Sequence, residues 1–373
     1  MKRRDILYGL SLVTILFLVG CSPQSSPTPA IITISPEPTT LTPTPTSTNT
    51  PFPSPTATPT ATPVIFPREI PATPESLVTP VYGESDDRAY RDVVWSPDGK
   101  SFALSGDGGI YLYLAENLSR VGWLQAKSIV HSVDFSTDGK YLASDSGKTT
   151  LLWDVNTQEL DYTFYDHNDQ VLDVVFSPDG KFLAIASADG IISVNDVNTR
   201  QAISRMKGHT DWVNSITFSS DGSMLASASL DGTVRLWNVM TGESIGTISA
   251  HNQGAYTIAF SPLDETVASG GADGKVRIWN SRTLQTQSEF YGDCVVVTKL
   301  AYSPDGNILA WGGMDGRIRL WDTSGQKLLS VLSGHAGVIL GLAFSPDGHY
   351  LLSSGSDGTA MIWDLSNLVG GTR

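Results

Sequence analysis

Histidine, cysteine and aspartate are the residues of this chain whose types could support acid–base, nucleophilic or metal chemistry. The six histidines and two cysteines would in principle suffice for a zinc site or a catalytic base. Four of the histidines, however, recur at intervals of 42, 42 and 84 residues: His167, His209, His251 and His335. This regular spacing indicates one position of a structural repeat, so we expect neither a metal centre nor a catalytic site built from them.

The acidic residues argue against polyanionic partners and cofactors. The chain has 38 Asp and Glu against 24 Lys and Arg, a formal charge of −14, whereas binding to a phosphate backbone needs clustered cations. Many aspartates stand in Asp-Gly pairs, which are typical of hairpin turns and not of phosphate-binding loops. We therefore expect no nucleic-acid partner and no cofactor.

A sequence repeat must position these side chains. The marker Ser-Pro-Asp-Gly, intact or degenerate, begins at Ser96, Ser136, Ser177, Ser219, Ser261, Ser303 and Ser345. Successive copies lie 40 to 42 residues apart, which is the period expected of four-stranded propeller blades. In the copy at residues 208–249, alternating apolar residues and turn residues predict strands at 213–218, 224–229, 233–237 and 244–249.

Gly-His, Ser-Pro-Asp-Gly, Asp-Gly and Trp-Asp at these spacings resemble the WD-repeat (WD40) family over about residues 78–366. The resemblance implies an all-β, seven-bladed β-propeller of four-stranded antiparallel blades. TolB-like propellers share Ser-Pro-Asp-Gly, and residues 110–113 of blade 1 resemble the repeats of that family. The Gly-His and Trp-Asp pairs of the later blades favour the WD-repeat family.

The resemblance also implies a buried hydrogen-bonded set in which histidine binds the tight-turn aspartate, the aspartate binds a strand-two serine, and the serine binds the tryptophan indole. Carried over to this chain, blade 4 has the complete set: His209, Ser229, Asp231 and Trp237. Blades 5 and 7 keep three members but have glycine at the serine position: His251, Asp273 and Trp279, and His335, Asp357 and Trp363. Blade 3 keeps His167, Ser187 and Asp189 but has Asn195 instead of tryptophan. Blades 1, 2 and 6 lack the histidine.

The ring must close, because an open seam would leave two unpaired blades. Only nine residues follow Asp364, too few for a good fourth strand of blade 7. Residues 78–84 align with residues 327–333, the fourth strand of blade 6. We expect this N-terminal segment to supply the outer strand of blade 7.

In WD-repeat propellers one face is built from residues near the start of strand one and the residue before the tight-turn aspartate. Here these positions predict a partner-binding face that contains Arg91, His131, Gln170, Leu172, Trp212, Asn214, Leu230, Tyr256, Thr298, Met314 and Leu340. The set is rich in aromatic and apolar residues and almost free of carboxylates, as protein interfaces are. The alternative is that Trp212 and Leu230 only pack between blades.

The first residues are typical of a secretory signal. Lys2, Arg3 and Arg4 precede an apolar run at 6–19, and Leu18-Val19-Gly20-Cys21 resembles the bacterial lipoprotein box. We expect a signal peptide at 1–20, lipidation of Cys21 and an extracytoplasmic protein anchored to a bacterial cell membrane; an uncleaved anchor is the alternative. Residues 22–80 contain 16 Pro and 15 Thr, so 21–77 should be a disordered linker. A proline-motif ligand is a further alternative for this segment.

The sequence thus predicts a membrane-tethered, extracytoplasmic interaction scaffold whose propeller, residues 78–373, is monomeric and binds a protein or peptide. We expect no enzymatic activity. The alternatives are an envelope enzyme that uses the central channel, for which Asp92 and Asp173 are the candidate acids, and a structural component of envelope assembly.

Overall fold

The structure is a computed structural model that describes residues 78–82, 89–291 and 296–369. The chain divides into two units, residues 1–60 and 61–373, and all described residues belong to the second. The predicted signal peptide, the predicted linker, Cys21 and Cys294 lie outside the described residues. Within the described part, no helix is long and apolar enough to cross a membrane.

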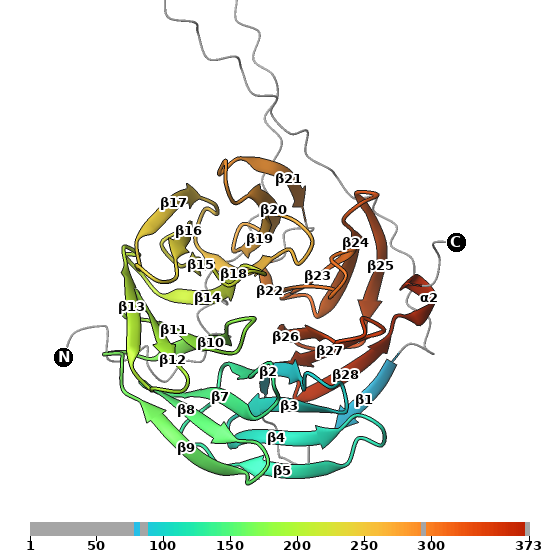
Figure 1. The fold of residues 1–373 in the computed structure, drawn as a ribbon. Helices are drawn as coiled ribbons and strands as arrows, with labels where there is room; N and C mark the ends of the chain where they lie inside the picture. Colours follow the sequence, from blue (N-terminus) through green and yellow to red (C-terminus); the bar gives the residue numbers. More distant parts are fainter. Residues whose placement is uncertain (1–77, 83–88, 292–295, 370–373) are drawn as a thin grey trace, which may run out of the picture. The chain divides into compact units, whose positions relative to one another are not determined.

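Seven four-stranded antiparallel sheets form a ring of blades, as predicted (Figure 1). Each blade is given from its innermost strand outward: blade 1 consists of β2 (Tyr90–Trp95), β3 (Ser101–Gly106), β4 (Gly109–Leu114) and β5 (Arg120–Leu124). Blade 2 consists of β6 (Val133–Phe135), β7 (Tyr141–Ser146), β8 (Thr149–Asp154) and β9 (Glu159–Phe164), and blade 3 of β10 (Val171–Phe176), β11 (Phe182–Ser187), β12 (Ile191–Asp196) and β13 (Ala202–Lys207). Blade 4 consists of β14 (Val213–Phe218), β15 (Met224–Ser229), β16 (Thr233–Asn238) and β17 (Ser244–Ser249).

The remaining three blades follow the same order. Blade 5 consists of β18 (Ala255–Phe260), β19 (Thr266–Gly271), β20 (Lys275–Asn280) and β21 (Thr286–Tyr291). Blade 6 consists of β22 (Val297–Tyr302), β23 (Ile308–Gly313), β24 (Arg317–Asp322) and β25 (Lys327–Ser333). Blade 7 consists of β26 (Ile339–Phe344), β27 (Tyr350–Gly355), β28 (Thr359–Asp364) and β1 (Val78–Tyr82). A short helix, α2 (Ser366–Val369), follows β28.

Blade 4 shows why these residues form strands. The second strand, β15, is buried along almost its whole length, because both faces of its sheet are covered by neighbouring blades. The outer strand, β17, is mostly exposed. The turn between β15 and β16 needs glycine: Gly232 has φ +83°, and a Cβ there would lie 2.6 Å from the backbone oxygen of His251.

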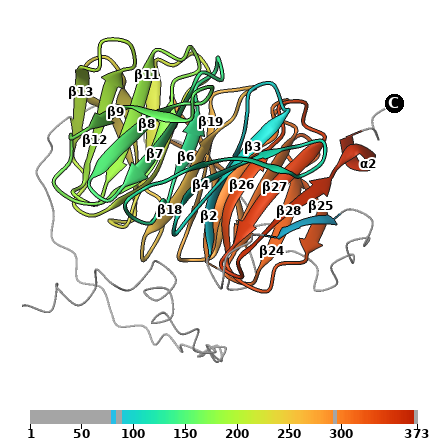
Figure 2. The ribbon, with the colours of Figure 1, turned by 90° about the horizontal axis from the view of Figure 1, so that it is seen from below.

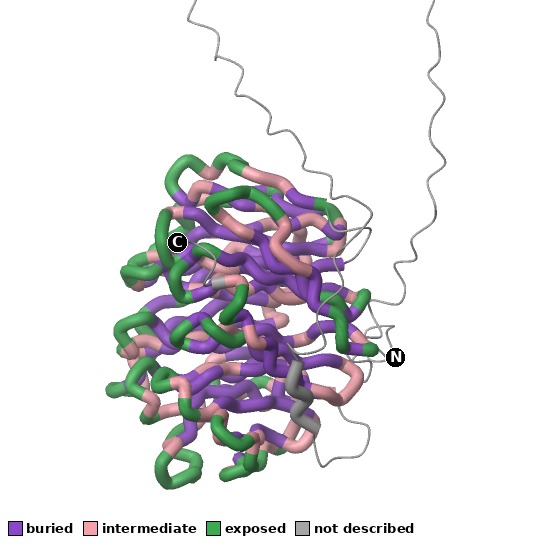
Figure 3. The backbone as a smooth tube through the Cα atoms, turned by 90° about the vertical axis from the view of Figure 1, so that its right-hand side faces the viewer, coloured by how far each residue is buried: buried purple, intermediate pink, exposed green. Residues whose placement is uncertain are grey.

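The hydrophobic core lies between blades, where the faces of adjacent sheets meet. One cluster joins Ile192 and Met206 of blade 3 to Ile216 and Trp237 of blade 4, and equivalent clusters recur around the ring. Figure 3 shows buried residues running through the blades and exposed residues concentrated in the connecting loops. Each blade is therefore stabilised mainly by its two neighbours.

The N-terminal strand closes the ring. The last sheet has the order β1-β28-β27-β26, and β1 pairs antiparallel with β28 from Val78 opposite Trp363 to Tyr82 opposite Thr359. Figure 2 shows β1 lying alongside β28 at the edge of this blade. The prediction that residues 78–84 supply the outer strand of blade 7 is confirmed for residues 78–82.

Candidate functional site

The repeated histidines lie in buried hydrogen-bonded sets, and blade 4 gives the geometry. His209 Nδ1 lies 2.9 Å from Asp231 Oδ2, and His209 Nε2 lies 2.7 Å from Ser227 Oγ. The indole N–H of Trp237 donates to the same serine oxygen at 2.8 Å. These distances fit an imidazole that donates from Nδ1 to the carboxylate and accepts the serine hydroxyl at Nε2. The histidine therefore joins the turn to the core of the blade.

The predicted pairing of this histidine with the tight-turn aspartate is confirmed, but the predicted serine is wrong. Ser229 accepts the backbone N–H of Asp231 at 3.1 Å and donates to the backbone oxygen of Asp211 at 3.2 Å. Ser187 makes the equivalent contacts in blade 3. These serines stabilise turns. The indole is bound by Ser227, two residues earlier and on the same face of β15.

Blades 5 and 7 are complete, contrary to prediction. His251 Nε2 lies 2.9 Å from Ser269 Oγ, and the indole of Trp279 donates to that oxygen at 2.8 Å. Ser353 makes both contacts in blade 7, at 2.7 Å to the histidine and 2.8 Å to the indole. The aspartate partners are those predicted: Asp273 for His251 at 2.8 Å and Asp357 for His335 at 3.2 Å. A Cβ at Gly271 would lie 2.5 Å from the His251 ring, so a larger residue at this position would clash with the imidazole.

Blades 3 and 6 use other residues for the same purpose. His167 Nδ1 lies 3.2 Å from Asp189, as predicted, but its Nε2 contacts Ser193 of β12 at 3.1 Å. In blade 6 the buried Arg319 donates to Asp315 at 2.7 Å, so an ion pair stands at the tight turn. The histidines of the repeat are thus structural, and their hydrogen-bonding atoms are occupied within the blades.

Replacing Ser227 with alanine should lower the free energy of unfolding by about 2–3 kcal/mol, because the buried histidine and indole nitrogens of blade 4 lose their shared partner. Ser229→Ala is the matched control and should cost about 1 kcal/mol, since its two partners are backbone groups of the exposed Asp211 and the partly exposed Asp231, which water can bind instead. Urea unfolding of both variants measures the difference. Equal losses, or a larger loss for Ser229→Ala, would contradict the assignment of Ser227.

Four charged side chains form a central cluster where the innermost strands meet: Asp92, Asp134, Asp173 and Lys299. Lys299 Nζ lies 3.0 Å from Asp92 Oδ1, and the side chain of Asp92 is only 6% exposed. The sequence singled out Asp92 and Asp173 as scattered acids. The structure places both on innermost strands of the ring, together with a lysine from β22.

The carboxylates of the central cluster also join neighbouring blades. Asp92 accepts the backbone N–H of Val133 at 3.3 Å, and Asp173 accepts that of Ile216 at 2.8 Å. Asp134 accepts a backbone N–H of β10 at 2.7 Å. Each carboxylate of one blade thereby binds the innermost strand of another, which fixes the register between blades. This use favours a structural role over an acid–base role.

Burial raises the pKa of Asp134 to about 7, and the nearby charges of Asp173 and Asp92 contribute in the same direction. Burial also raises the pKa of Asp173, although the charge of Lys299 opposes this. Burial disfavours the charge of Lys299 itself, but the carboxylates around it raise its pKa overall. One lysine thus compensates three acidic groups. No group of three or more metal-binding side chains occurs among the described residues.

All eleven residues predicted for the binding face are partly exposed. They lie at or just before the start of innermost strands or directly before tight turns, at one end of the blades. Trp212 and Leu230 adjoin, since the N–H of Leu230 donates to the carbonyl oxygen of Trp212 at 2.9 Å. Tyr256 follows in the next blade, and burial raises its pKa. This part of the face combines aromatic and aliphatic surface without a formal charge.

Other predicted face residues are engaged within the propeller. Asn214 donates to the backbone oxygen of Ala255 at 2.9 Å, and Thr298 donates to that of Ile339 at 2.6 Å. Both side chains therefore join adjacent blades. Arg91 lies 3.6 Å from Asp107, with its side chain 9% exposed.

His131, which the sequence predicted only for the binding face, has a carboxylate partner in blade 2. Its Nδ1 lies 3.1 Å from Asp145 Oδ2, and Asp145 is fully buried. The side-chain amide of Gln170 lies 3.3 Å from both ring nitrogens. The predicted face thus has hydrogen-bonding side chains at blades 1–3, namely Arg91, His131 and Gln170, whereas its aromatic residues, Trp212 and Tyr256, lie at blades 4 and 5.

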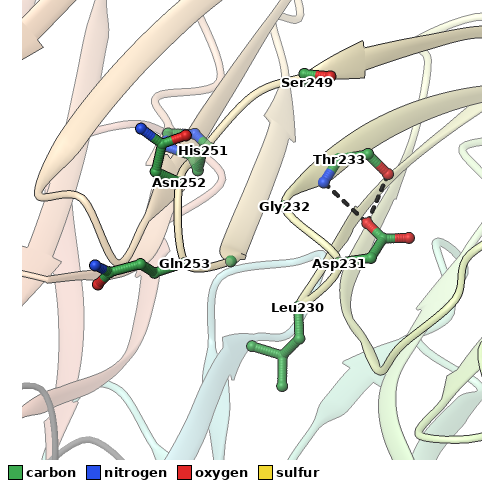
Figure 4. A pocket seen from close by; sticks show the side chains of 9 residues that line it. Leu230, Asp231, Gly232, Thr233, Ser249, His251, Asn252 and Gln253 are labelled. Carbon is green, nitrogen blue, oxygen red and sulfur yellow. Dashed lines mark hydrogen bonds between the residues drawn. The ribbon is translucent and has the colours of Figure 1, made fainter.

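A pocket of about 270 Å³ opens between blades 4 and 5, beside the aromatic part of the face (Figure 4). Leu230, a predicted face residue, lines it together with Asp231, Gly232, Thr233, Ser249, His251, Asn252, Gln253 and Gly254. Gly254 has φ +117°, and a Cβ there would lie 3.1 Å from Leu230 Cδ2. Asn252 and Gln253, which stand directly after the repeated histidine, were not among the residues predicted from the sequence.

The fold and its repeated Asp–His–Ser–Trp sets define a WD-repeat propeller. Residues 170–367 match the family model described as "IFT122 first beta-propeller", and residues 119–154 match the WD domain, G-beta repeat model. The first match covers more than half of the chain, so the protein belongs to this family of WD-repeat β-propellers.

Curated relatives resemble short parts of the chain. Actin-interacting protein 1 of Drosophila melanogaster is 30% identical over 113 residues, which are 28% of this chain and 18% of the relative. WD repeat-containing protein 1 of Rattus norvegicus is 32% identical over 112 residues, 28% and 18% of the two chains. Superkiller complex protein 8 of Dictyostelium discoideum is 38% identical over 64 residues, 17% and 21%. The matches thus span only about a fifth of each relative.

Proposed function

We propose that this protein is a non-enzymatic binding scaffold that recognises a protein or peptide on the predicted face. The observation that carries the proposal is the aromatic and uncharged surface at Trp212, Leu230 and Tyr256, in a protein of net charge −14. Surfaces of this composition are typical of interface cores. Two of the relatives, an actin-interacting protein and a superkiller complex protein, are named for association with other proteins, which supports a binding role.

The proposed location rests on the sequence. A basic start, a short apolar run and the lipoprotein-like box at Cys21 support an extracytoplasmic protein held at a bacterial cell membrane by lipid. The Pro- and Thr-rich segment that follows would act as the linker to the propeller. We propose a monomeric propeller and no nucleic-acid partner, because the domain is acidic.

An enzyme of the envelope remains the alternative of a different class. It would need ionisable groups free to act on a substrate. The internal contacts of Asp92, Asp173 and Lys299 support the scaffold instead, since these atoms bind neighbouring blades and each other. A purely structural role in envelope assembly would require no discrete partner, and cross-linking in cells separates it from the scaffold.

Trp212→Ala and Tyr256→Ala should each reduce recovery of a cross-linked partner by at least about tenfold, because aromatic residues at the centre of an interface contribute most of its binding energy. The full-length chain is cross-linked in cells, captured, and its partners are quantified by mass spectrometry. Met240→Ala is the matched control, since Met240 is an apolar side chain 59% exposed in a turn that is not part of the face. Thermal unfolding of each variant confirms that the fold is intact.

A protein recovered equally with the wild type and with both face variants would count against the proposal. If no partner depends on Trp212 or Tyr256, the purely structural role is favoured.

A further inference from the structure

We infer that the pocket between blades 4 and 5 receives a basic side chain, lysine or arginine, from the protein partner bound to the propeller face. The inference rests on the proposed binding function and specifies the chemistry of its partner. Leu230 belongs both to the face and to the pocket wall, and Gly254 of the wall stands two residues before Tyr256 of the face, so a peptide on the face can reach the pocket with one side chain. Pockets for drug-sized ligands occupy about 300–1,000 Å³. The volume here, about 270 Å³, suits a single side chain.

The polar lining offers oxygen atoms. Figure 4 shows Asp231 and Thr233 on one side of the pocket and Asn252 and Gln253 on the other. Asn252 and Gln253 are exposed, as is Ser249 at the end of β17. Their amide and hydroxyl oxygens can accept hydrogen bonds from an ammonium or guanidinium group, which are the strongest donors among side chains.

Asp231 supplies negative charge. Burial works against its ionisation, but hydrogen bonds from His209 and Thr233 hold its pKa below the ordinary value. Its oxygens accept the Thr233 hydroxyl at 2.6 Å and the Thr210 N–H at 3.0 Å, among other donors. The carboxylate is therefore ionised at neutral pH and acts on a ligand by its field rather than by a direct bond.

No cation in the pocket wall compensates this charge. The nine lining residues include neither lysine nor arginine, and burial lowers the pKa of His251, which keeps that ring neutral near pH 7. Arg277 contacts His251 at 2.9 Å but also pairs with Asp273 at 2.8 Å and Glu289 at 2.7 Å. An acidic ligand would be repelled here. A neutral ligand would gain no charge–charge attraction from Asp231.

Shape also favours a long basic side chain. Leu230 gives the pocket one apolar side chain at the face, and the polar side chains lie on the two sides of the pocket. Lysine and arginine combine an aliphatic stem with a charged end, so the stem can lie along Leu230 while the charge reaches the oxygens. The net charge of −14 would accelerate encounter with such a partner.

The test uses the full-length chain in mild detergent and an immobilised heptapeptide library. The central position is fixed in turn as Lys, Arg, Gln or Glu, and the other six are randomised. We expect the Lys and Arg pools to retain the protein most strongly. The best peptide is then resynthesised with Gln at the centre, and fluorescence anisotropy should show at least about tenfold weaker binding, since a charge-assisted hydrogen bond is lost.

The variant Asn252→Lys places a competing cation at the pocket. It should weaken binding of the Lys peptide at least fivefold, while its affinity for the Gln peptide should stay within twofold of that of the wild type. Ala336→Lys is the matched control. Ala336 is exposed and occupies the equivalent position after the histidine of blade 7. A lysine there adds the same charge to the same end of the propeller, but away from the pocket.

The outcomes separate this inference from the proposed function. Equal weakening by Asn252→Lys and Ala336→Lys, or no preference for basic pools, would overturn the inference. If Trp212→Ala then still abolishes peptide binding, the face binds partners but the pocket does not select a basic residue. If no pool is retained above the level of the Trp212→Ala variant, both the inference and the proposed function fail.

Discussion

Deleting residues 1–84 should lower the melting temperature of the propeller by more than about 10 °C or prevent folding altogether. The deletion removes β1, which is hydrogen-bonded to β28 over five residue pairs. Each backbone hydrogen bond contributes about 0.5–1.5 kcal/mol, and β28 would become an unprotected edge in a three-stranded blade. A loss of about 4–5 kcal/mol corresponds to a shift of this size, at about 2–4 °C per kcal/mol for a large domain.

The control for this deletion is a shorter one, of residues 1–70, which removes most of the Pro- and Thr-rich segment and leaves β1. Its melting temperature should stay within about 2 °C of the full chain, because no described pairing is lost. Circular dichroism at 218 nm follows both transitions. An unchanged melting temperature after deletion of residues 1–84 would show that closure by β1 contributes nothing to stability.

Replacing Lys299 with methionine should cost about 3 kcal/mol of unfolding free energy at pH 8. The lysine is the one cation of the central cluster, and its loss leaves three acidic groups at the centre of the ring without compensation. Removing one partner of a buried ion pair typically costs about 3–5 kcal/mol, and the partial exposure of Lys299 places the expected cost at the lower end.

The cost should be clearly smaller at pH 5. The pKa of Asp134 is raised from 3.8 to about 7 in the folded protein, so the folded state binds more protons than the unfolded state between these values. The contribution of Asp134 to the stability of the wild type therefore falls as pH rises from about 4 through 7. Without Lys299 the pKa of Asp173 rises further, because the charge of the lysine lowers it, and the fall in stability with pH becomes steeper.

Urea unfolding at pH 5 and pH 8 measures the effect. Adding Asp134→Asn to Lys299→Met should restore part of the stability at pH 8 and flatten the pH dependence. Lys100→Met is the control, because the Lys100 side chain is 82% exposed and its loss should change stability by less than about 0.5 kcal/mol. Equal losses at both pH values would show that the charge of Lys299 does not stabilise the cluster.

The repeat made the architecture predictable. Alternating apolar residues and Asp-Gly turns recur in every blade, and three of the four strands predicted in residues 208–249 have the bounds found in the structure. The third strand extends one residue further, to Asn238. Closure by the N-terminal segment followed from the missing fourth strand of blade 7. Both inferences concern backbone periodicity, which a sequence expresses directly.

The choice between two serines was not settled by the same reasoning. Ser227 and Ser229 are two residues apart on one strand, so both point to one face, and the family pattern as carried over to this chain selected the wrong one. A signal was available: serine stands eight residues after the marker serine at Ser144, Ser227, Ser269 and Ser353. In blades 5 and 7 the serine predicted from the family pattern is absent, whereas the serine eight residues after the marker is present.

Contacts across the ring had no signal in the sequence. Lys299 and Asp92 come from different repeats at the same repeat position, and nothing in the spacing tells which members of a ring of seven will meet. The pairing of His131 with Asp145 was missed because blade 2 has a shortened tight turn, so the usual position of the aspartate is empty there. Such pairs depend on side-chain packing in three dimensions.

Closure by β1 also has a consequence for how the protein is made. The strand that seals the ring is synthesised first among the propeller strands, and its partner β28 is synthesised last. Nearly the whole domain separates them, so their pairing closes the longest loop in the fold and carries the largest entropic cost. The ring can therefore close only after translation of the domain is complete. Until then the nascent chain exposes the unsealed faces of its end blades, and exposed apolar faces of this kind favour aggregation.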